Sequence, residues 1–263
     1  MSINFDIRKL ALFFLLVSPL CTSAKELVPV PAGEFKMPAV LNKKSIAVAS
    51  FQIDEHAVTN REYLEFVKAV PEWRKSRVKK IFADASYLNY WKRDDDFGKV
   101  ALPQSPAVQV SWYAARAYCQ WVGKRLPSIN EWEYVASAPL KNQGDIKSVI
   151  LEWYGKGTEW PLPVVKKKSL NSLGVYDMHG VIWEWVEDFN SSLVTGESRA
   201  DGSLDKNLFC GAGASGAADP SDYAAFMRFA FRSSLQARYT VQNLGFRCAK
   251  DIVELNTEKN AEK

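Results

Sequence analysis

The chain has 263 residues, of which 47% are hydrophobic and nine are tryptophan, and its formal net charge is +4. This length and composition are typical of a globular chain and predict one large domain with a substantial core. So weak a basic balance gives no electrostatic reason to expect a nucleic acid as partner, because that partner needs lysines and arginines gathered along one face. The short run Lys166-Lys167-Lys168 is interpreted as a solvated loop.

Residues 1–24 are predicted to be a signal peptide. Arg8 and Lys9 precede an uncharged apolar run from Leu10 to Val17, which is too short to cross a bilayer as a helix. Thr22-Ser23-Ala24 then offers the small residues of a cleavage site, so we expect cleavage after Ala24.

Export has consequences for charge and location. Removal of residues 1–24 takes away Arg8, Lys9 and Asp6, which leaves 32 basic and 29 acidic residues and a formal charge of +3. We expect a periplasmic or secreted protein with no stable membrane anchor after cleavage. The alternative is lipidation at Cys21, although Leu20 is bulkier than the residue that normally precedes such a site.

Three capped helices are predicted. Thr59-Asn60-Arg61-Glu62 fits a capping box, so one helix should run from about Asn60 to Val70. Ser111 caps a second helix that Gly123 ends, and Ser128-Ile129-Asn130-Glu131 is a capping box that starts a third.

Short strands and long irregular stretches fill the rest of the chain. Residues 27–33, 46–53 and 106–110 are predicted to be strands interrupted by proline and glycine. Residues 25–252 are expected to form the domain, and residues 253–263, rich in Glu, Lys and Asn, a flexible tail. Pattern alone therefore predicts only a mixed, loop-rich fold.

Five segments, in order along the chain, carry a family resemblance. They are Phe51–Asp54 leading to Val58–Tyr63; Pro106–Trp112 with Ala117–Trp121; Gly123–Ser128 with Glu131–Tyr134; Asn171–Gly180 with Trp183–Trp185; and Gly245–Ala249. Together they resemble the formylglycine-generating enzyme, or sulfatase-modifying factor, family over roughly residues 27 to 250. The resemblance implies a single compact α+β domain of the C-type-lectin-like kind, with much irregular structure.

The resemblance also implies a structural calcium site. Similar proteins bind calcium through a side chain at the Asp177 position, carbonyl oxygens at the Gly180 and Ile182 positions, and the carboxylate at the Glu184 position. These residue types fit, because calcium prefers several hard oxygen ligands. The alternative is that Asp177 only caps a turn and that Glu184 pairs with an arginine.

The cysteines that remain after cleavage are Cys119, Cys210 and Cys248. Family members join the cysteines at the Cys119 and Cys248 positions, so the resemblance implies that disulfide. Cys210 is then left over. It is interpreted as a buried small residue, with a soft metal ligand or reactive thiol as the alternative.

The family's best-known chemistry is missing. Formylglycine-generating enzymes bind copper through two cysteines five residues apart, and these positions fall on Phe226 and Phe231. A phenyl ring cannot ligate copper. Other branches hold iron with three histidines, whereas this chain has only His56 and His179. We therefore expect neither copper nor iron at the family's sites, and hydrogen-bonded or surface roles for both histidines.

A glycine- and alanine-rich stretch precedes the two phenylalanines. It suggests a ligand groove that includes Cys210 and Asp222, with Arg228 and Arg232 as donors to carboxylates or carbonyl oxygens. A flexible surface loop beside a packed aromatic cluster is the alternative.

Three hypotheses on function follow. The first is an exported accessory or maturation protein that binds a segment of a periplasmic redox or copper enzyme and has no formylglycine-generating activity. The stretch 210–226 and Glu187–Asn190 resemble accessory proteins encoded beside copper nitrite reductases. The second is a modifying enzyme or oxidoreductase of the same family with a relocated active centre, and the third is a lectin-like binding module.

Overall fold

The structure, a computed structural model, describes residues 26–36, 45–141, 146–156, 158–190 and 220–252. The predicted signal peptide, the predicted tail and Cys210 lie outside these residues.

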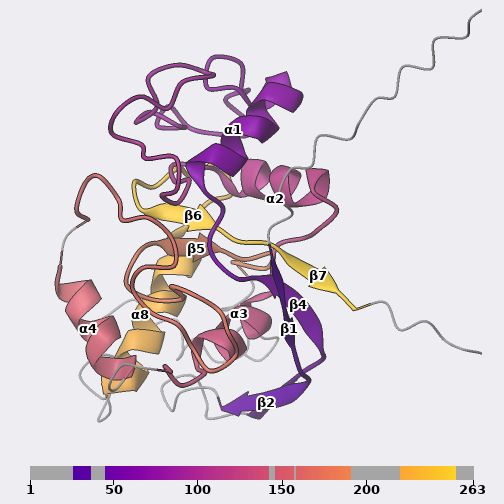
Figure 1. Ribbon diagram of the computed structural model, residues 1–263, viewed down its shortest axis with the longest axis vertical. Coiled ribbons are helices and arrows are strands. Elements are labelled where there is room, and N and C mark those ends of the chain that lie inside the picture. The colour runs from indigo at the N-terminus through magenta and orange to yellow at the C-terminus, as the bar shows by residue number, and fades with distance from the viewer. Residues whose placement is uncertain (1–25, 37–44, 142–145, 157, 191–219, 253–263) are drawn as a thin grey trace, which may run out of the picture.

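Short strands form three small sheets (Figure 1). These are an antiparallel sheet in the order β1 (Leu27–Val30), β4 (Phe51–Asp54), β7 (Ala249–Asp251); an antiparallel pair of β2 (Gly33–Lys36) and β3 (Ser45–Val48); and a parallel pair of β5 (Trp183–Trp185) and β6 (Leu244–Phe246). The predicted strand 46–53 is thus two strands in two sheets, because the chain turns at residues 49–50. The α+β class expected from the resemblance is confirmed.

The predicted strand at 106–110 is wrong. Gln109 has a positive φ of 51°, which no strand contains, and its carbonyl accepts from the Leu88 N–H instead of a strand neighbour. The segment is nevertheless held firmly, because the Ala107 N–H donates to the Val58 carbonyl.

The three predicted helices are confirmed. They are α1 (Asn60–Ala69), α2 (Trp112–Trp121) and α3 (Ile129–Ala136), and both capping boxes and the Ser111 cap are present. A short 3-10 helix, η2 (Pro71–Trp73), follows α1. Two further helices, α4 (Ile146–Gly155) and α8 (Pro220–Ser234), were not predicted.

An aromatic core holds α1 and α2 against the C-terminal strands. The buried ring of Tyr63 packs on those of Phe66, Tyr118 and Phe246. The disulfide that the resemblance implied is confirmed, because Cys119 of α2 is bonded to Cys248 with a Cα–Cα distance of 5.6 Å.

The remaining helices lie at another part of the domain (Figure 1). Helices α4 and α8 pack on each other in the lower part of that view, near α3 and β5, whereas the segment between α1 and α2 gathers at its top. Within the described ranges, no helix is long and apolar enough to cross a membrane.

Candidate functional site: helix α8 and the buried charges behind it

Helix α8 is held to α3 by a buried cluster of charges. Arg228 donates three hydrogen bonds to the carboxylate of Glu133, and Arg232 donates a fourth at 2.6 Å. All three side chains are buried. The Arg232 guanidinium also stacks on the Trp132 ring at 4.5 Å. The residue type at 133 thus determines how α8, which carries the family's two copper positions, is placed.

This cluster contains more positive than negative charge. Burial alone would raise the pKa of Glu133, but the two arginines hold it at about 2, so the carboxylate is ionised at neutral pH. Two guanidinium charges thus face one carboxylate. His179, at the same place, is kept neutral: burial and then Arg228 lower its pKa to about 3. One nitrogen of Arg228, Nη1, is buried and has no hydrogen-bond partner.

A second buried ion pair lies under β5. The carboxylate of Glu184 accepts from Nε and Nη2 of Arg247, each at 2.8 Å, and from the Trp132 indole N–H at 2.8 Å. Both charged side chains are inaccessible to solvent. Gly245, which pairs with Glu184 between β5 and β6, lets this ladder lie against residue 107, because a Cβ there would be 2.4 Å from the Ala107 carbonyl oxygen.

The predicted calcium residues lie near this pair. Asp177, at a φ of 54°, accepts backbone N–H groups from Lys167, Lys168 and Ser169. Both contacts of the alternative interpretation are therefore present: Asp177 caps a turn, and Glu184 pairs with an arginine, Arg247. A carboxylate has about four lone-pair positions, and three are used in each case, so one remains for a metal. Calcium binding stays a prediction.

Aromatic rings pack around Phe231, a residue that the family resemblance places at a copper-cysteine position. The ring of Phe231 lies on Trp183 with 4.6 Å between ring centroids. Trp183 in turn contacts Trp153 and Tyr154 of α4. Among the described residues, no three His, Cys, Asp or Glu side chains are grouped as a metal site. Phe226 belongs to α8, but its side chain is outside what the structure describes.

A hollow opens beside this aromatic stack. It has a volume of about 200 Å³ and is lined by polar and apolar groups in similar measure, with Trp153, Lys156 and Lys168 among them. The other lining residues are Thr158, Glu159, Pro161, Leu162, Pro163, Gly180 and Val181. Trp153 therefore connects the hollow, through Trp183, to the ring of Phe231.

The residues of the predicted ligand groove are not those that line the hollow. Arg228 and Arg232 are buried on Glu133 and do not line the hollow. Asp222 lies in α8, with its side chain outside the described part, and Cys210 lies outside it entirely. Both histidines are hydrogen-bonded, as expected: His56 to the Ala57 carbonyl and His179 to the Ala136 carbonyl.

Sequence reasoning missed Glu133 and Trp153. Glu133 stands inside a segment already quoted for the family resemblance, Glu131–Tyr134, but nothing in the local pattern indicates its partners nearly 100 residues away. No sequence pattern indicated Trp153 either, because the helix that carries it, α4, was not predicted.

The geometry defines a compact α+β domain in which a disulfide joins α2 to the segment between β6 and β7, and in which buried ion pairs link α8 to α3 and β5 to that same segment. A family comparison agrees: the "Sulfatase-modifying factor enzyme 1-like domain" matches residues 14–252. The chain therefore belongs to the sulfatase-modifying factor, or formylglycine-generating enzyme, family.

Similar proteins include both active and inactive relatives. The chain is 28% identical to the "Formylglycine-generating enzyme" of Streptomyces coelicolor, over 87% of this chain and 90% of that protein. It is 27% identical to the "Inactive C-alpha-formylglycine-generating enzyme 2" of Bos taurus, over 85% and 87%. PvdO from Pseudomonas aeruginosa shares the fold, with a TM-score of 0.53 over 88% of this chain and 96% of that one, at 20% identity.

Proposed function

We propose that this protein is a non-catalytic member of its family, an exported accessory or maturation factor that binds a segment of a periplasmic redox or copper enzyme. The observation that carries the proposal is Phe231 packed on Trp183 at the position of a copper-binding cysteine. A phenyl ring offers no lone pair to a metal, so copper has no ligand at this residue. A similarity to a protein named as inactive is consistent with this loss.

The hollow beside the stack supports the binding part of the proposal. Its walls combine the ring of Trp153 and two prolines with the ammonium groups of Lys156 and Lys168. A concave site that combines apolar side chains with charged and hydroxyl groups can hold a short peptide segment by both packing and hydrogen bonds. Export agrees with the Cys119–Cys248 disulfide, because disulfides persist in oxidising compartments.

A copper nitrite reductase is the client that we propose to test, since the sequence resembles proteins encoded beside such enzymes. The experiment measures the binding of this chain to immobilised copper-free nitrite reductase. Thr158→Trp, which fills the hollow, should abolish the interaction, whereas Gln236→Trp, at an exposed position after α8, should leave it unchanged.

Two results would contradict the proposal. Equal binding by both variants would show that the hollow is not the contact. A redox metal at stoichiometric occupancy in the purified protein would favour the second hypothesis, an enzyme with a relocated centre.

A further inference from the structure

The segment that follows α1 projects both charge and hydrocarbon into solvent. Residues 77–82 are Arg-Val-Lys-Lys-Ile-Phe, and all of them except Val78 are exposed. Ile81 is 72% exposed, more than any other large hydrophobic side chain among the described residues. The Phe82 ring contacts Tyr113, which is itself exposed, at 5.4 Å. We call residues 77–82 and Tyr113 the basic–aromatic surface.

The chain's excess positive charge is concentrated here. Residues 71–82 contain five basic side chains and one acidic one, a net charge of +4. The whole chain has 34 basic and 30 acidic residues, which is also +4, so the other 251 residues sum to zero. Such an asymmetry produces a local positive potential that the overall balance hides.

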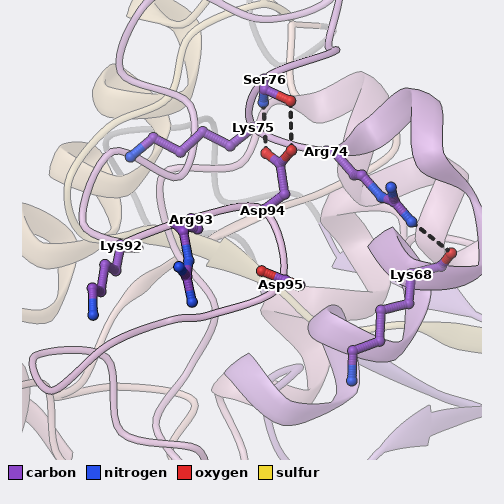
Figure 2. Close-up of a pocket in the computed structure, with 8 residues that line it drawn as sticks. All are labelled: Lys68, Arg74, Lys75, Ser76, Lys92, Arg93, Asp94 and Asp95. Carbon is purple, nitrogen blue, oxygen red and sulfur yellow. Dashed lines mark hydrogen bonds between the residues drawn. The ribbon is translucent and has the colours of Figure 1, made fainter.

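The neighbouring aspartates do not neutralise these exposed cations directly. Asp94 accepts two hydrogen bonds from Ser76, as Figure 2 shows. Asp84 accepts from the backbone and the hydroxyl of Thr240. Lys75 is also engaged, because its ammonium donates to the Asn89 and Trp91 carbonyls. None of these contacts joins an aspartate to Arg77, Lys79 or Lys80, whose side chains are exposed.

The same contacts hold the surface in place. Ser76 and Lys75 fix its beginning, and the Asp84 N–H donates to the Arg238 carbonyl just beyond its end. Two successive turns lie between these points, closed by Val78 on Arg74 and by Ala83 on Lys79. Ile81 is therefore held out in solvent by a fixed backbone, so little ordering entropy would be lost when a partner covers it.

Cationic hollows flank this surface. One has a volume of about 710 Å³ and is lined by Lys68, Arg74, Lys75, Ser76, Lys92, Arg93, Asp94 and Asp95, most of them cationic (Figure 2). Another, of about 430 Å³, includes Lys75, Lys80 and Arg238. Asp94 and Asp95 line the first hollow and Asp84 the second, but cations outnumber aspartates in each, and neither hollow is lined by Ile81 or Phe82.

We propose that the basic–aromatic surface binds an anionic phospholipid bilayer. Projecting apolar side chains can enter the boundary between headgroups and acyl chains, while the adjacent lysines and arginines meet the headgroup phosphates. An acidic polypeptide would match the charges, but it would give no reason for a solvent-exposed isoleucine at a fixed turn. In Figure 1 this part of the chain lies at the top of the view, away from α4 and α8, so membrane binding leaves the hollow beside Trp153 open.

The test is co-sedimentation with vesicles of phosphatidylcholine mixed with phosphatidylglycerol, compared with vesicles of phosphatidylcholine alone. The chain is used from Lys25 onward, so that residues 1–24 cannot contribute, and every described element is retained. Each cation near an anionic surface changes the partition coefficient about fivefold, so Lys79→Gln with Lys80→Gln should weaken binding on the order of 25-fold. Ile81→Ser should weaken it by about tenfold.

Matched variants test whether the location matters. Lys167→Gln with Lys250→Gln removes two exposed charges elsewhere, and Ile252→Ser removes an exposed isoleucine elsewhere. Neither control should reduce binding by more than about twofold, since the field of a distant surface charge is screened. All of the changed side chains are exposed, so loss of the fold does not account for the differences.

Binding to the anionic vesicles that falls with added salt and with the surface variants alone supports the proposal. Absence of binding to those vesicles, or equal losses in the control variants, overturns it. Binding to a polyglutamate peptide in preference to the vesicles, unaffected by Ile81→Ser, also overturns it, in favour of an acidic polypeptide partner.

Discussion

Replacing Glu133 by glutamine would test whether the buried charges place α8. The substitution keeps the shape of the side chain but removes the charge that receives four hydrogen bonds from Arg228 and Arg232. Two guanidinium charges would then be buried without a counter-charge from residue 133. Breaking a buried pair in this way typically costs about 3–5 kcal/mol. For a domain of this size each kcal/mol lowers Tm by about 2–4 °C, so Tm should fall by roughly 6–20 °C.

Urea denaturation and thermal melting, followed by circular dichroism, measure this loss. The control is Glu152→Gln, because Glu152 pairs with Lys156 on the exposed side of α4, where loss of the pair should leave Tm unchanged. A loss below about 1 kcal/mol for Glu133→Gln would refute the reasoning, since that is the size expected of an exposed pair. An apolar triple variant, with Glu133→Leu, Arg228→Met and Arg232→Met, should recover much of the stability if charge rather than packing is the cause.

Three further measurements concern the rest of the domain. Because the pKa of His179 falls from 6.5 to about 3 in the folded state, the unfolded chain takes up a proton first as pH falls. The free energy of unfolding should therefore be retained above pH 6.5 and decrease by about 1.4 kcal/mol per unit as pH falls from about 6.5 to 5. His179→Gln should flatten this part of the pH profile. Mass mapping of the unreduced protein should find Cys119 linked to Cys248, and reduction should cost on the order of 4–5 kcal/mol; a different linkage would refute the pairing. Calcium should raise Tm by mass action and Asp177→Ala should abolish that rise, whereas identical melting curves with and without chelator would exclude the site.

Local sequence patterns predicted the helices whose stabilising hydrogen bonds join residues close together in the sequence. The capping boxes at Thr59 and Ser128 predicted α1 and α3, because their hydrogen bonds join residues only three apart. The strand prediction at 106–110 failed because tertiary contacts, which a local pattern does not contain, determine the backbone there. Its apolar residues are buried by tertiary contacts, and a left-handed Gln109 turns the backbone where an alternating pattern would continue.

The candidate site was predictable only in part. The family resemblance implied the disulfide, which the structure confirms. The assignment of Phe231 to a copper-ligand position stays a prediction. The resemblance did not identify Glu133 as the partner of Arg228 and Arg232, because the two sides of the cluster are 95 and 99 residues apart. The sequence predicted these arginines to be accessible donors in a groove. In the structure both are buried in the core.

The glycine- and alanine-rich stretch before α8 also obscured that helix. Its composition suggested either a groove or a loop, yet α8 begins at Pro220, a residue favoured in the first turn of a helix. The sequence signal for α4 is weaker: Asp145, a residue type favoured at a helix N-cap, precedes Ile146, but no Glu or Gln follows it at the third position to complete a capping box.

The central claim is that this family member has lost its family's reaction, and an activity assay tests it most directly. The purified protein, loaded with Cu(I) under oxygen, is incubated with a sulfatase-type cysteine peptide, and the peptide mass is measured against a copper-only control and an active formylglycine-generating enzyme. With phenylalanine at positions 226 and 231, no thiolate pair is available there to hold copper, so the peptide cysteine should remain unchanged. Conversion of that cysteine to formylglycine above the copper-only control would contradict the account.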